Sequence, residues 1–204
     1  MKKILLSVIT VAILSVVSQA QLKVGIIAGE NLNEQRINVS TGTMYAGDRS
    51  RGYHAGVISE LNLGGNFYLQ PQLLFSRKRS AYFNSTSTGE IKIRMSYIEL
   101  PVNVLYKIAL PFGKVFAGAG ATFGYAVGGS EQKSGVTTKL YSGTVRNWKR
   151  EDISMNMLAG IEFQNGFFAN MNYQKSFLDI YKGADASVKS RSFSLSIGYL
   201  IALK

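Results

Sequence analysis

The chain has 204 residues, a net charge of +11 and no cysteine, which together exclude a disulfide scaffold and thiolate chemistry. It contains 21 glycines but only 3 prolines, and 11 residues each of Tyr and Phe, a composition that favours strands and turns over helices. Metal-ligand clusters, phosphate-binding loops and nucleophile elbows are missing from the sequence, so we expect neither a cofactor nor a bound metal nor an enzyme.

The N-terminal segment Met1–Ala20 has the pattern of an export signal. Lys2 and Lys3 precede the apolar stretch Ile4–Val17, and Ser18-Gln19-Ala20 places small residues at the two positions that a signal peptidase reads. Such a stretch is too short and wrongly flanked for a membrane-spanning helix. We therefore expect cleavage after Ala20, with one domain over residues 21–204.

That domain shows eight segments in which apolar and polar residues alternate with the two-residue period of a strand. The predicted strands are Leu22–Ala28, Gly52–Leu63, Phe67–Arg79, Ile91–Lys107, Val115–Val127, Glu151–Phe163, Phe167–Leu178 and Arg191–Leu203. Long connections are predicted over Asn31–Arg51, Ser80–Glu90, Gly128–Arg150 (with Trp148) and Asp179–Ser190. Long and short connections alternate, which is typical of an up-and-down barrel with short periplasmic turns and long outer loops. An even strand count also lets the last strand pair with the first.

The clearest alternation lies in Arg94–Lys107. One row carries Ile98, Leu100, Val102, Val104 and Tyr106, and the other carries Tyr97, Glu99, Pro101, Asn103 and Leu105. An apolar row of this length exceeds what a small water-soluble sheet needs, whereas about 9–11 residues let a strand cross a bilayer. Upstream, Ile93 and Met95 fall in phase with Glu99, from which we expect a bulge near Ser96.

A soluble, lipocalin-like carrier of an apolar ligand would show the same period, with its apolar face turned inward. Here the other face is mostly Ser, Gly, Asn and Gln, and one strand has glycine at Gly118, Gly120 and Gly124, which indicates a tightly filled interior. Eight strands enclose room only for packed side chains. The sequence therefore favours an all-β fold, an eight-stranded antiparallel up-and-down transmembrane β-barrel, with the lipocalin-like barrel as the alternative.

Several segments carry a family resemblance. They are Tyr97-Ile98-Glu99-Leu100-Pro101-Val102 with Tyr106-Lys107, Gly52-Tyr53-His54-Ala55-Gly56 leading to Glu60, Leu69–Ser76, and the Gly118–Gly120 strand. In these the chain resembles the PorT-like outer-membrane barrels of the Bacteroidetes, related in architecture to OmpX and the OmpA barrel. The resemblance implies a location in the cell outer membrane. The group's namesake is associated with a secretion apparatus, and the resemblance assigns no functional residue. Gln72 stands where the family often has Glu.

Charged residues on the inward phase form the first candidate site, an interior polar cluster. Its members are Glu60, Glu99, Glu162, Lys78 and Lys107. The cluster could line a narrow or gated path, or it could be a structural plug, because a buried carboxylate needs a partner. The single histidine, His54, falls on the same phase and is expected to be a plain interior residue.

The second candidate site is a basic rim at the strand ends next to the long connections. Its members are Arg77, Arg79, Arg94, Lys149, Arg150 and Arg191, with Lys78, Lys92, Arg146, Lys182 and Lys189 nearby in sequence. Arginine binds phosphate bidentately, so the rim could bind anionic outer-membrane lipid such as lipopolysaccharide; the alternative is ordinary solvated charge. An exported protein is not expected to bind nucleic acid.

The leading functional hypothesis is a non-enzymatic outer-membrane barrel with a structural, surface-interaction or assembly role, using its outer loops to contact an unknown protein partner. The alternatives are a narrow or gated transport pathway, an outer-membrane enzyme for which the sequence offers no acid/base pair, and the lipocalin-like carrier.

Overall fold

The computed structural model describes residues 22–39, 44–46, 50–83, 90–133, 135–141, 149–178 and 186–203. The expected signal peptide, Trp148, Arg146 and Lys182 lie outside these residues. Within the described ranges no helix is long and apolar enough to span a membrane.

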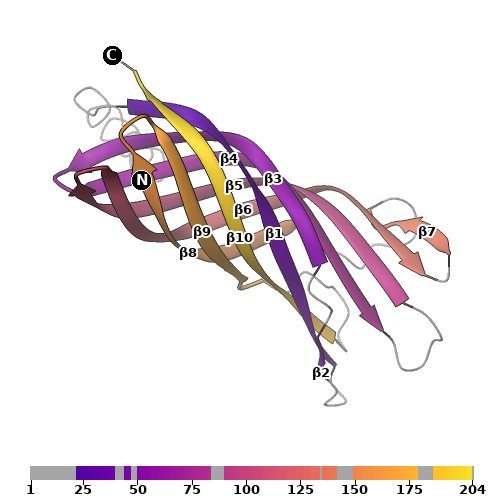
Figure 1. Ribbon diagram of the computed structural model, residues 1–204. Helices are drawn as coiled ribbons and strands as arrows, with labels where there is room; N and C mark the ends of the chain where they lie inside the picture. Colours follow the sequence, from indigo (N-terminus) through magenta and orange to yellow (C-terminus); the bar gives the residue numbers. More distant parts are fainter. Residues whose placement is uncertain are drawn as a thin grey trace, which may run out of the picture.

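The described residues form one antiparallel sheet that closes into a barrel (Figure 1). The strands are β1 (Leu22–Val39), β2 (Met44–Ala46), β3 (Ser50–Gly64), β4 (Phe67–Phe83), β5 (Glu90–Leu110), β6 (Gly113–Lys133), β7 (Val136–Lys139), β8 (Glu151–Phe163), β9 (Phe167–Ser176) and β10 (Ala186–Ala202). The long strands β1, β3, β4, β5, β6, β8, β9 and β10 make the wall, each pairing with the next in the chain, and β10 pairs with β1 to close it. The predicted eight-stranded antiparallel barrel is thus confirmed.

Strand boundaries lie close to the prediction at the end of the barrel with the short turns and depart further from it at the other end. The range Glu151–Phe163 is observed as predicted. The expected connection Asn31–Arg51 is wrong in part, because β1 continues to Val39 and β2 pairs with it. The expected connection Gly128–Arg150 is likewise interrupted, since β6 runs to Lys133 and pairs with β7. These extensions keep their backbone ladder although their sequence does not alternate in hydrophobicity.

A register shift between β5 and β6 lies at Ser96/Tyr97, where a bulge was predicted. Ser96 pairs with Gly128 and Tyr97 with Ala126, so the extra residue is Val127 on β6, not a residue of β5. The inward row of β5 therefore passes the shift unbroken, and Ile93, Met95, Tyr97 and Glu99 are all buried.

The two ends of the barrel differ. Three tight turns gather at one, which we call the turn end; β2, β7 and the strand ends that the long connections join lie at the other, the loop end (Figure 1). Gly64 and Gly65 in the β3–β4 turn have φ of 113° and 56°, a region that glycine enters without steric cost. The predicted alternation of short and long connections therefore puts the short turns at one end of the barrel and the strand ends joined by the long connections at the other.

The outer wall is apolar over the middle of every long strand. Exposed side chains there include Ile26, Val57, Leu73, Leu100, Val104, Phe123, Met157, Met171 and Ile197. Ile197 is 70% exposed and Ile26 66%. Near the turn end, the rings of Phe67 and Tyr106, and those of Phe167 and Tyr199, make edge-to-face contacts at 5.2 and 4.8 Å. This is the aromatic girdle and apolar band of a membrane barrel, and the reverse of a lipocalin.

The interior is filled by side chains that reach across from facing strands. A Cβ added at Gly160 would lie 2.5 Å from the Phe116 ring, and one at Gly198 would lie 2.3 Å from the Phe168 ring. Both glycines thus give up their side-chain volume to an aromatic residue. Buried apolar residues form two clusters, Ile27, Ile58, Leu74, Phe168 and Leu200, and Tyr68, Leu105, Phe116 and Leu158.

Candidate functional site

Near the turn end, a buried lysine joins two carboxylates from other strands. Lys107 Nζ on β5 lies 2.6 Å from Glu60 Oε2 on β3 and also pairs with Glu162 on β8. Lys23 on β1 pairs with Glu162 from the other side. The side chains of Lys107 and Glu60 are each 1% exposed, so water contributes little to their solvation and each charge depends on its ion-pair partner. We call these four residues the Lys107 cluster.

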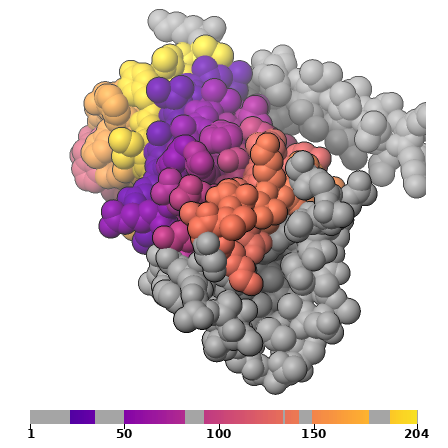
Figure 2. Space-filling view, turned by 90° about the vertical axis from the view of Figure 1, so that its right-hand side faces the viewer, coloured from indigo at the N-terminus to yellow at the C-terminus, as the bar shows by residue number. Residues whose placement is uncertain are grey.

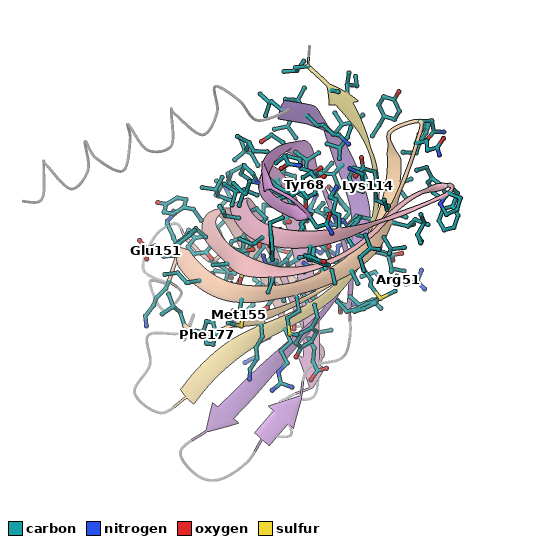
Figure 3. The ribbon with its side chains drawn as sticks, turned by 90° about the vertical axis from the view of Figure 1, so that its left-hand side faces the viewer. Arg51, Tyr68, Lys114, Glu151, Met155 and Phe177 are labelled. Atoms are coloured by element: carbon teal, nitrogen blue, oxygen red, sulfur yellow. The ribbon has the colours of Figure 1, made fainter. Side chains whose placement is uncertain are left out.

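Aromatic and amide groups complete the Lys107 cluster. Lys107 Nζ lies 4.9 Å from the ring centre of Tyr68 and 5.3 Å from that of Phe116, within the range of a cation–π interaction. Gln70 donates to Glu60 at 3.2 Å. Lys114 donates to the Tyr68 hydroxyl at 3.0 Å, and Figure 3 shows both side chains together near the turn end.

A second ion pair lies further toward the loop end. Lys78 Nζ on β4 is 2.6 Å from Glu99 Oε1 on β5, and both side chains are less than 10% exposed. Ser76 donates to Glu99, and Gln174 approaches the same carboxylate at 3.5 Å. Lys78 also lies 5.1 Å from the ring centre of Tyr97. We call Lys78, Glu99, Ser76 and Gln174 the Lys78 cluster.

The five residues of the predicted interior cluster therefore lie inside the barrel, but in two separate groups. Between the groups, the inward rows of β3, β5 and β8 carry Ile58, Leu105 and Leu158, which are buried and apolar. The sequence reasoning missed Lys23 as a member. Its inward phase on β1 was the available signal.

Amides and hydroxyls fill the middle of the barrel. Asn156 donates to Thr122 at 2.7 Å and to Asn103 at 3.1 Å. His54 Nδ1 lies 2.6 Å from Asn31 Oδ1, and His54 Nε2 lies 2.9 Å from Ser196 Oγ. Because an amide oxygen only accepts, Nδ1 carries a proton, and in the neutral imidazole Nε2 then accepts from Ser196.

The order Asn–His–Ser has the form of a hydrolase triad, but the space around it does not suit one. His54 and Ser196 line an internal cavity of about 40 Å³, together with Glu99, Gln72 and Asn172 among others. A cavity of that size holds a few water molecules and no organic substrate. The described residues also contain no group of three or more His, Cys, Asp or Glu side chains that could hold a metal ion.

At the loop end, Arg150 ties β8 to the β6–β7 region. Its guanidinium donates to the carbonyl oxygens of Ala126 (2.9 Å) and Tyr141 (3.4 Å) and lies 4.6 Å from the Tyr141 ring centre. Burial raises the pKa of Tyr141, an effect that Arg150 opposes. Leu140 is 1% exposed and donates its backbone N–H to Gly129. Ile93 on β5 is likewise 1% exposed, and Figure 2 shows the outer surface of the β6–β7 region.

The residues of the predicted basic rim differ in their exposure and in the direction in which their side chains point. Arg79 and Arg94 are exposed on the outer wall, and Arg77, Lys149 and Arg191 are half-buried. Arg150 uses its guanidinium within the protein, and Lys78, also considered for the rim, points inward. The sequence reasoning missed Arg51 on β3, which is exposed and lies 3.4 Å from Glu30; Figure 3 shows it at the outside of the barrel.

On most wall strands the outward row changes from apolar to charged at a similar height. The first charged residues are Glu30, Arg51, Arg77, Arg94, Glu151, Lys175 and Arg191. Arg77 lies ten residues after Phe67 on β4, and ten steps of about 3.3 Å at a tilt of about 40° rise by about 25 Å. That height equals the apolar band of an outer-membrane barrel. The charged residues therefore mark where the apolar band ends.

A closed antiparallel barrel with an apolar outer wall, an aromatic girdle and a polar interior is a transmembrane β-barrel. The family model "Outer membrane protein beta-barrel domain" matches residues 17–182, and the chain belongs to that family. The protein is thus located in the outer membrane, as predicted, and the soluble lipocalin-like alternative is wrong because the apolar face looks outward.

Solved structures to which the chain is similar include OprG from Pseudomonas aeruginosa, with a TM-score of 0.52 and 7% identity over 90% of this chain and 97% of that one. Ail, the attachment invasion locus protein of Yersinia pestis, gives 0.45 and 16% over 89% and 99%. Neisserial surface protein A gives 0.46 and 12% over 87% and 96%. Among curated proteins no sequence relative matches. At these identities the likeness concerns the fold alone.

Proposed function

We propose that this protein is a non-enzymatic barrel that acts at its loop end, as a structural, surface-interaction or assembly factor exported by the signal peptide Met1–Ala20. The observation that carries the proposal is the closed interior. Lys107 and its carboxylates obstruct the turn end, Ile58, Leu105 and Leu158 follow, and a cavity of about 40 Å³ is the room left around Glu99. We expect a barrel whose described interior is filled in this way to work through its surface.

The loop end offers that surface. Strands β5 and β6 have 21 residues each, about twice the length that crosses a bilayer. Beyond the apolar band, β4, β5, β6 and β7 continue as one sheet, and β2, β1 and β10 as another. In barrels of this class the long connections face the outside of the cell. Protein partners at these extensions, and the PorT-like subgroup, are parts of the proposal.

The competing function is a narrow or gated transport pathway, favoured by the polar middle of the barrel. A planar-bilayer recording of the purified full chain separates the two. We expect no conductance steps from this protein in a preparation where a general porin produces them. Steady conductance that responds to substitution of Lys107 or Glu60 would replace our proposal with the transport pathway.

The site of interaction is tested by photo-crosslinking in intact cells. A photoreactive residue at Thr138 on β7, which is exposed, should give protein adducts. The same residue at Met157, 62% exposed in the apolar band, is the control and should give lipid adducts only. Protein adducts at Met157 alone would move the partner from the loop end to the membrane-embedded wall. N-terminal sequencing of the mature protein should begin at Gln21.

A further inference from the structure

We infer that Arg77, Arg79 and Arg94, on the outward face of β4 and β5, form a binding site for the phosphate group of a glycolipid in the outer leaflet. This inference rests on the proposed orientation, with the loop end outside. Of the six residues of the predicted basic rim, the inferred site keeps three, and it specifies their cross-strand arrangement on β4 and β5.

The first observation is a like-charge pair in the barrel wall. Arg79 and Arg94 occupy directly opposite positions of β4 and β5, and both side chains are exposed. Arg77 is the next outward-facing residue of β4 toward the turn end. It lies opposite Ser96 and diagonal to Arg94. Like charges at opposite positions destabilise a sheet unless something neutralises them.

The second observation is that nothing in the described part of the chain neutralises these arginines. None of the three makes an ion pair there, whereas their neighbour Arg51 pairs with Glu30 at 3.4 Å. The Nε atom of Arg77 is buried and has no hydrogen-bond partner. The three guanidinium groups thus have no counter-charge in the described part of the chain, and an anion bound beside them would supply one.

The surroundings select a lipid as the source of the anion. Just toward the turn end, the outward rows carry Phe75 and Ile98, opposite one another and each 40% exposed, and then Leu73 and Leu100. The three guanidinium groups therefore lie at the top of the apolar band, about 25 Å above the turn-end girdle. A lipid with a phosphorylated head group would place acyl chains along this wall and its phosphate between arginines, which bind phosphate bidentately.

A second charged pair on the other side of the barrel supplies a matched control. Lys175 on β9 and Arg191 on β10 are also opposite one another and outward, but Arg191 has Glu34 of β1 as its other cross-strand neighbour. Removing Lys175 and Arg191 lowers the net charge by the same amount as removing Arg79 and Arg94. The Glu34 carboxylate beside Arg191 already offsets part of the positive charge of this control pair.

The test uses the full-length protein, purified from outer membranes and delipidated in a neutral detergent. Binding of bis-phosphorylated lipid A is measured by native mass spectrometry for the wild type, Arg79→Gln/Arg94→Gln and Lys175→Gln/Arg191→Gln. We expect Arg79→Gln/Arg94→Gln to weaken binding by at least about tenfold, because the substitutions remove two charged donors from the phosphate. The control variant should bind within about threefold of the wild type.

The melting temperature provides a second test, because the double variant should lower the affinity for lipid A without lowering the stability of the lipid-free protein. Without lipid A, Arg79→Gln/Arg94→Gln should melt at or above the temperature of the wild type, because the repulsion is gone. With lipid A, only the wild type and the control variant should gain thermal stability. Heat-modifiable gel mobility verifies that every variant is folded.

Four outcomes would overturn the inference. They are equal binding of dephosphorylated lipid A, equal weakening in the control variant, unchanged binding by Arg79→Gln/Arg94→Gln, and binding of dextran sulfate with the same dependence on Arg79 and Arg94, which would reassign the site to a soluble polyanion. None of them bears on the bilayer recording, so the closed-barrel proposal stands or falls separately.

Discussion

The Lys107 cluster and the Lys78 cluster both compensate buried charges inside the barrel, but with different partners. In the Lys107 cluster a single ammonium group sits between two carboxylates, its side chain 1% exposed, with the Tyr68 and Phe116 rings on it. In the Lys78 cluster one lysine meets one glutamate, and Ser76 and Gln174 supply further donors. Glu99 also lines the internal cavity, which neither Lys107 nor its carboxylates do.

This difference in partners determines how strongly the stability of the barrel depends on each lysine. Without Lys107, two carboxylates would face each other in a packed interior, and Lys23 contacts only one of them. Without Lys78, Glu99 would keep its hydroxyl and amide donors and could be reached by water in the cavity. The barrel should therefore be far more sensitive to loss of the first lysine than of the second.

The largest expected effect is that of Lys107→Met. Removing one partner of a buried ion pair costs about 3–5 kcal/mol, and here two carboxylates are left behind. Urea unfolding of the full chain in lipid vesicles measures the loss. The triple variant Lys107→Met/Glu60→Gln/Glu162→Gln should recover most of it, whereas a loss below about 1 kcal/mol for the single variant would show that the cluster is solvated.

Lys78→Met should destabilise the barrel less, by about 1–3 kcal/mol, which is the cost of a buried acceptor that loses one of several partners. The same unfolding experiment applies, with Lys78→Met/Glu99→Gln as the control that removes the orphaned charge. If Lys78→Met proved as damaging as Lys107→Met, the argument from the remaining donors and the cavity would fail.

The smallest of the three effects is expected for Arg150→Gln at the loop end. The substitution removes two hydrogen bonds to carbonyl oxygens and the stacking on Tyr141, for a global loss of about 1 kcal/mol. Hydrogen exchange should accelerate in β7 and at Leu140 and stay unchanged around Lys107 and Glu60. Faster exchange at the turn end as well would mean that the two ends are not energetically separate.

Part of this architecture could be predicted from residue alternation. The difference between a lipid-facing and an inward-facing position is large, so Glu151–Phe163 was predicted to the residue and the inward phase of Glu60, Glu99 and Glu162 could be read from the chain. The strand ends beyond the apolar band could not, because both faces of β1 near Val39 and of β6 near Lys133 lack that contrast. Their pairing depends on neighbours far away in the sequence, such as Ala186 for Val39.

The sequence by itself determined the class of fold, the outer-membrane location and which face of each strand meets lipid, since a two-residue period records the contrast between two environments. Only the tertiary structure decided which charges meet. The stagger of the strands sets that Lys107 reaches Glu60 and Glu162 while Lys78 reaches Glu99, and that Arg79 stands opposite Arg94. A register is a relation between strands, and no single strand contains it.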